Sequence, residues 1–162
     1  MTLAAKTQIP FWPVPLTLHT MAVMAFAVFL GPRAAVSIFL TYLAAGAVGL
    51  PVFSGTPERG IGLAYMAGPT GGYLFGYLIA SWVVGALASG RSLVAKFGAM
   101  ILGLVVIYGF GLAWLWKMLP ASQLLAVGLI PLLPGDLLKV ALVALASLPI
   151  KSAIRRTRTD RQ

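Results

Sequence analysis

The sequence predicts an all-α fold, a polytopic bundle of membrane-spanning helices. Of its 162 residues, 60% are hydrophobic and 9% are charged, and the mean hydropathy is +0.96. An ordinary soluble domain has about 25% charged residues, so this composition leaves too little polar surface for a soluble fold. Long apolar stretches also alternate with connections that carry Gly, Pro or basic residues. The length suits one integral membrane domain over residues 1–162.

The positions of the apolar stretches define the expected elements. Residues 1–15 form a mixed opening segment, where three prolines within residues 10–15 forbid a regular helix. Several of the later stretches are slightly shorter than the ~20 residues that a spanning helix typically needs, so flanking residues should extend them. Helices are expected over Leu16–Leu30, Ala34–Leu50, Tyr73–Ser89, Phe97–Trp116, and a composite of Leu124–Leu133 and Leu137–Ile150 that is split at Pro134-Gly135.

A long connection, residues 51–72, separates the second and third stretches. It is rich in Gly, Pro, Ser and Thr, and a long irregular loop in a small bundle is usually a lid or a binding loop. Its Glu58 and Arg59 fit a solvated pair, with gating of an entrance as the alternative.

Basic residues predict the orientation in the membrane. Arg33, the 89–96 connection and the tail at 151–162 fall on one side and hold eight of the twelve Lys and Arg residues. The positive-inside rule makes this side, including the C-terminus, cytoplasmic in a multi-pass membrane protein. Five spans would then leave the N-terminus outside, unless the chain lacks an N-terminal helix.

Asp136 and Lys139 form the strongest candidate site. The chain has three acidic residues, and Asp136 alone lies within an apolar stretch. Ionisable groups at membrane depth are expensive and mark functional sites by default. Residues i and i+3 share a helix face, so the pair offers an acceptor and a donor to one small ligand. The structural alternative is a local ion pair that caps the helix, with Lys139 reaching toward the interface.

Two further segments are weaker candidates. Gly68-Pro69-Thr70-Gly71-Gly72-Tyr73 leads from the loop into a helix, where free N–H groups can hold an anionic group. A tight turn followed by close helix packing is the alternative. Phe53 could cover an apolar ligand, although such a residue more often packs against the bundle.

The sequence lacks the residues that several other classes of function would require. The chain has no cysteine and one histidine, His19, so no metal site or disulfide is expected. His19 fits a buried, hydrogen-bonding residue better. No nucleophile and base can be assembled into an enzyme site, no cofactor is indicated, and the net charge of +9 does not indicate nucleic acid because the basic residues lie at span ends and in the tail.

Several motifs together resemble one family. They are Pro13-Val14-Pro15-Leu16-Thr17-Leu18, Gly31-Pro32-Arg33, Gly46-Ala47-Val48-Gly49-Leu50-Pro51-Val52-Phe53, Gly68-Pro69-Thr70-Gly71-Gly72-Tyr73-Leu74 and Pro134-Gly135-Asp136-Leu137-Leu138-Lys139. The chain resembles the BioY family, the biotin-specific substrate-binding (S) components of energy-coupling-factor (ECF) vitamin transporters.

The resemblance implies a six-helix S-component fold, with the first helix largely missing here, and capture of biotin at the outer face for uptake. Carried over by motif, the implied biotin-binding residues are Asp136, Lys139, Tyr73, Thr70, Gly71, Gly72 and Phe53. The implied partners are biotin, a transmembrane coupling protein and cytoplasmic ATPase subunits, with the lipid bilayer around the chain. His19 stands where family members usually carry Gln.

The alternatives are an S component for another vitamin and a non-transporting membrane scaffold. The scaffold hypothesis predicts that changing Asp136 and Lys139 leaves function intact.

Overall fold

The computed structural model describes residues 1–9, 14, 16–54 and 61–148. In these residues the chain forms a bundle of helices with one small pair of strands. The elements are α1 (Thr2–Lys6), β1 (Gln8–Ile9), β2 (Leu16–Thr17), α2 (His19–Leu30), α3 (Pro32–Ala47), α4 (Leu63–Ala67), α5 (Gly71–Ala88), α6 (Leu93–Leu115), α7 (Ala121–Gly128) and α8 (Leu133–Ala146).

The expected helical stretches are present, with shifted ends. Glycine and proline set several of these ends. Gly31, at φ +81°, ends α2, and Pro32 begins α3, because proline fits the first turn of a helix. A short connection joins α5 to α6, where Gly90 has φ +69° and the Ser92 side chain accepts a hydrogen bond from the Ala95 N–H.

The structure corrects three expectations. The break in the last stretch falls at residues 129–132, not at Pro134-Gly135, because α8 includes both residues in its first turn. The loop at 51–72 contains the short helix α4. Beside the short helix α1, the opening segment contributes an unexpected antiparallel pair, in which Gln8 lies opposite Thr17 and Ile9 opposite Leu16, and the predicted all-α class still holds.

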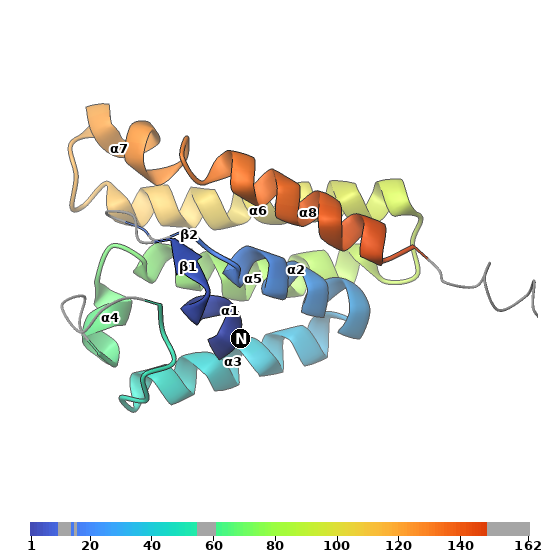
Figure 1. The fold of residues 1–162 in the computed structure, drawn as a ribbon, viewed down its shortest axis with the longest axis horizontal. Coiled ribbons are helices and arrows are strands. Elements are labelled where there is room, and N and C mark those ends of the chain that lie inside the picture. The colour runs from blue at the N-terminus through green and yellow to red at the C-terminus, as the bar shows by residue number, and fades with distance from the viewer. Residues whose placement is uncertain (10–13, 15, 55–60, 149–162) are drawn as a thin grey trace, which may run out of the picture.

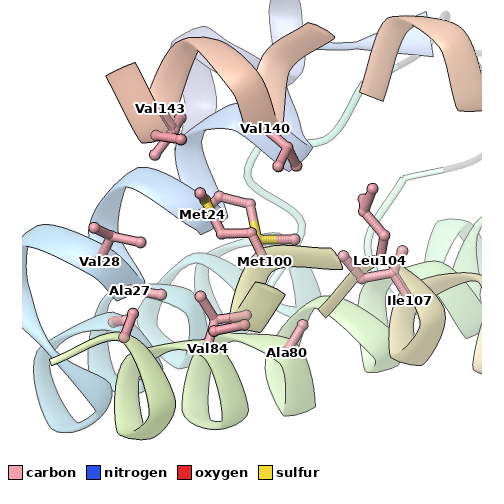
Figure 2. Close-up of a cluster of buried hydrophobic side chains, with 14 of the residues drawn as sticks. Met24, Ala27, Val28, Ala80, Val84, Met100, Leu104, Ile107, Val140 and Val143 are labelled. Atoms are coloured by element: carbon pink, nitrogen blue, oxygen red, sulfur yellow. The ribbon is translucent and has the colours of Figure 1, made fainter. Parts of the chain in front are cut away.

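The two longest helices, α5 and α6, pack along each other at the centre of the bundle. Helix α5 also contacts α2 and α3, and α8 lies against α2 and α6 (Figure 1). Side chains from α2, α5, α6 and α8 meet in the main buried cluster, which includes Met24, Val84, Met100 and Val140 (Figure 2). A second cluster, around Phe39, Tyr42, Phe53 and Tyr65, lies between α3, the loop and α4.

Within the described residues, three segments are long and apolar enough to cross a membrane. They are Gly71–Ala88, Leu93–Leu115 and the 26 residues of Ala121–Ala146, and His19–Leu30 is a shorter apolar helix. Large apolar side chains such as Val94, Val105 and Leu138 lie on the outside of the bundle, which suits a hydrocarbon surrounding. The chain is therefore a membrane protein.

The bundle has two different ends (Figure 1). The α2–α3 turn, the α5–α6 connection and the C-terminal end of α8 lie at one end, where Lys96 Nζ donates to the Ser147 carbonyl at 3.3 Å. The strand pair, α4 and α7 lie toward the other end, where α5 and α8 begin. The candidate site residues lie at this second end.

Candidate functional site

Asp136 lies in the first turn of α8 and is 5% exposed. Its carboxylate accepts two hydrogen bonds: Lys139 Nζ donates to Oδ1 at 2.8 Å, and the Tyr108 hydroxyl donates to Oδ2 at 2.8 Å. A negative charge near a helix N-terminus is also stabilised by the helix dipole. The helix start, a cation and a hydroxyl thus hold a buried carboxylate in one orientation.

Lys139 connects α8 to the N-terminal strand pair. Besides Asp136, its Nζ donates to the backbone carbonyl of Thr17, in β2, at 2.6 Å. The Lys139 side chain is 15% exposed, so the ammonium is held inside the protein instead of extending into water. The ion pair is local, at i and i+3, and it also fixes the position of β2.

Two adjoining hollows lie beside this pair. The charged hollow is lined by Val14, Thr17, Thr20, Tyr73, Tyr77, Ile107, Tyr108, Leu132, Asp136 and Lys139. The neutral hollow is lined by Val14, Thr17, His19, Ser54, Tyr65, Thr70, Tyr73, Leu74 and Tyr77. They share the walls made by Val14, Thr17, Tyr73 and Tyr77, so the two hollows are neighbours.

Both hollows are narrow. Each has a volume of about 20 Å³, roughly enough for a single water molecule. Sites for small organic ligands usually measure about 300–1,000 Å³. An organic ligand therefore has to displace some of the lining side chains.

Four of the predicted site residues line the hollows. Asp136 and Lys139 line the charged hollow, Thr70 lines the neutral one, and Tyr73 lines both. The Tyr73 hydroxyl donates to the carbonyl of Gly128 at 2.7 Å, which fixes α7 against α5.

The other three predicted residues pack beside the hollows. Phe53 stacks on Tyr65 at 4.8 Å between ring centroids and covers Gly46. Gly71 and Gly72 lie against Met66 and Trp114, and a Cβ at Gly72 would come within 2.2 Å of the Trp114 Cβ. The Trp114 indole N–H donates to the Gly68 carbonyl at 3.0 Å and so holds the turn before α5. A ligand contact by these three residues stays a prediction.

Sequence reasoning missed several polar lining residues. Tyr108 is one of them: its hydroxyl, on α6, donates to the Asp136 carboxylate on α8. Thr20 and Tyr77 share a hydrogen bond at 3.0 Å, as do Ser54 and Tyr65 at 2.8 Å. No spacing within one helix links these residues, because each pair joins separate elements. His19 is buried as expected, but its Nε2 has no hydrogen-bond partner among the described residues.

The chemical groups at this site are suited to binding a small molecule. A carboxylate acceptor, an ammonium donor, hydroxyls and aromatic walls suit a small molecule that has both N–H and carbonyl groups. Within the described part of the chain, no three His, Asp or Glu side chains come together as a metal site would require.

The comparison with protein families decides the relationship, since the model of the BioY family matches residues 1–156. The chain belongs to the BioY family. "Biotin transporter BioY" of Thermotoga maritima is 35% identical over 93% of this chain and 89% of its own length. "Biotin transporter BioY" of Rhizobium etli is 38% identical over 83% and 76%. "Probable biotin transporter BioY" of Pyrococcus horikoshii is 33% identical over 86% and 82%.

A solved structure agrees with this membership of the BioY family. The S-component for biotin from an ECF-type ABC transporter superposes with a TM-score of 0.75 and 25% identity, covering 98% of this chain and 84% of that one. The predicted S-component fold is thereby confirmed, as is the resemblance to the BioY family.

Proposed function

We propose that this chain is a biotin-binding transport component, which captures biotin at the outer face of the membrane for uptake. The observation that carries the proposal is the buried Asp136 carboxylate, held by Lys139 and Tyr108 beside the charged hollow. Membership of the BioY family, and the printed names of its relatives, support biotin as the substrate.

The chemistry of biotin complements the two hollows. Its ureido ring has two N–H donors and one carbonyl, which match the Asp136 acceptor and the Lys139 donor. Its apolar thiophane ring suits the aromatic walls of Tyr73 and Tyr77, and its valerate chain leads to a carboxylate at the opposite end of the molecule. A site with buried polar partners should reject analogues that lack the ureido group, because those partners would then be left unpaired.

The proposal includes partners but no catalytic activity of this chain. The sequence contains no Gly-x-x-x-x-Gly-Lys-Ser/Thr phosphate loop, so energy for uptake would come from cytoplasmic ATPase subunits through a transmembrane coupling protein. We place the chain in the plasma (inner) membrane because uptake from outside the cell takes place there. The basic residues support a cytoplasmic C-terminus.

The decisive experiment is equilibrium binding of radiolabelled biotin to the purified protein in detergent. Saturable binding by the wild type is expected, and Asp136→Asn should weaken it by roughly 30-fold or more, because a hydrogen bond to a charged group is worth about 2 kcal/mol. Asp160→Asn, which removes a carboxylate from the tail, is the matched control and should bind like the wild type.

Two results would overturn the proposal. A wild type that does not bind biotin but binds another vitamin would indicate an S component of different specificity. A well-folded Asp136→Asn, Lys139→Ala double variant that retains every function in cells would indicate a scaffold. Size-exclusion chromatography and thermal melting of each variant separate loss of binding from loss of fold.

A further inference from the structure

His19 is a buried residue whose position is only partly explained by packing. It begins α2, is 3% exposed, and its ring stacks on Tyr77 at 5.5 Å between centroids. Tyr42 and Phe39 meet it edge-on at 5.0 and 6.2 Å. Aromatic pairs of this kind stabilise a ring, and a phenylalanine would form them equally well.

The ring nitrogen is the unexplained feature. Nε2 of His19 is buried and has no hydrogen-bond partner among the described residues. Nearly all buried polar atoms in folded proteins have a hydrogen-bond partner, because a polar atom that loses water and gains no other partner costs free energy. His19 also lines the neutral hollow. A ligand that enters there and displaces lining side chains can therefore supply the partner that this buried nitrogen lacks.

The surroundings of His19 indicate which group that partner carries. His19 lines the neutral hollow together with the hydroxyl-bearing residues Ser54, Tyr65 and Thr70, and none of the described lining residues is charged. Asp136 and Lys139 line only the other hollow. Thr70 also precedes the 18-residue helix α5, whose N-terminus favours a negative charge. Among the described lining residues, hydroxyl donors and a helix start with no carboxylate beside them suit an anion.

We propose that His19 is a specificity-determining residue whose Nε2–H donates a hydrogen bond to the carboxylate of the bound ligand. The inference rests on the proposed function and extends it: with the ureido ring at Asp136 and Lys139, the valerate chain would pass the shared walls at Tyr73 and Tyr77 and end in the neutral hollow. The two ends of the ligand are then recognised by separate residues.

The test pairs two variants with two ligands. His19→Phe keeps a ring for stacking on Tyr77 but removes both nitrogens, and His19→Gln restores an N–H donor. The ligands are biotin and its analogue with the carboxylate replaced by a methyl group. Calorimetric titration of the purified protein in detergent should show at least tenfold weaker binding of biotin by His19→Phe, less than twofold change for the methyl analogue, and recovery of biotin binding in His19→Gln.

Asp136→Asn is the control at the opposite end of the ligand and should weaken both ligands by the same factor. The inference is overturned if His19→Phe binds biotin like the wild type, or if it weakens both ligands equally. In either case the wild type still binds biotin, and the proposed function stands. If the wild type itself fails to bind biotin, the proposed function is overturned, and the role of His19 with it.

Discussion

At the scale of single residues, the defining feature is a carboxylate that is buried away from water and is still hydrogen-bonded to a cation and a hydroxyl. Burial of an ion pair costs desolvation energy, and attraction between the charges offsets that cost only where further hydrogen bonds complete the arrangement. Tyr108 and the Thr17 carbonyl supply those bonds to Asp136 and Lys139. A ligand that binds here can exchange these bonds for its own without leaving either charge alone.

A double-mutant cycle on this pair should show strong coupling. Asp136→Asn leaves the Lys139 ammonium buried without a counter-charge. Lys139→Met leaves the Asp136 carboxylate buried without one. Each single variant should therefore lower the melting temperature by several degrees. The double variant removes both charges. Its loss of unfolding free energy should therefore be smaller than the sum of the two single losses, by about 1–3 kcal/mol. Thermal unfolding followed by intrinsic tryptophan fluorescence in detergent gives the four values.

Additive effects in this cycle would contradict the buried-pair description and would indicate that water screens the two side chains. Ligand-free protein must be used throughout, because bound biotin would stabilise the variants unequally.

At the scale of elements, close contact between α5 and α6 positions the site. Tyr73 and Tyr77 lie on α5 and Tyr108 on α6, so the spacing between these helices sets the distance from the aromatic walls to Asp136. Gly76 permits the approach: a Cβ there would lie 2.8 Å from the Cα of Ile107 and 3.0 Å from its carbonyl oxygen. Small residues serve this purpose widely between membrane helices.

Gly76→Ala should therefore destabilise the protein, although alanine is intrinsically better in a helix by about 1 kcal/mol. The methyl group meets backbone atoms that cannot rotate away, and overpacking of this kind costs about 1–3 kcal/mol. Gly109→Ala on α6 is the control, because nothing lies within 4 Å of its Cβ position, and it should melt at or above the wild-type temperature. Equal melting temperatures for the two variants would contradict the described contact.

The elements also show which features of the fold and of the site could be predicted from the sequence. Hydropathy located the helical stretches, because burial in lipid requires long apolar runs whatever their packing. It misplaced the break before α8, since proline is compatible with the first turn of a helix as well as with a loop. Asp136 and Lys139 could be found because charge is rare in such a chain. Tyr108 and Ser54 could not, because their hydrogen-bond partners belong to other elements, at separations that no helix or strand repeat predicts.

At the scale of the whole molecule, the two ends of the bundle have different chemistry. Arg33, Arg91 and Lys96 lie in or beside the turns at one end, and the charged and neutral hollows lie where α5 and α8 begin, toward the other. This separation is what an uptake component needs, because the ligand arrives on one side and the coupling machinery acts from the other. It also makes the orientation in the membrane a condition of the proposed function.

The absence of cysteine from the sequence makes that orientation directly measurable. We expect Arg91→Cys, in the α5–α6 connection, to react with a membrane-impermeant maleimide only after the cells are permeabilised. Ser122→Cys, exposed on α7 at the opposite end, should react in intact cells. The wild type, with no thiol, is the blank, and uptake of labelled biotin shows that each variant is assembled. The reverse pattern of labelling would place the hollows on the cytoplasmic side and exclude capture of biotin from outside through this site.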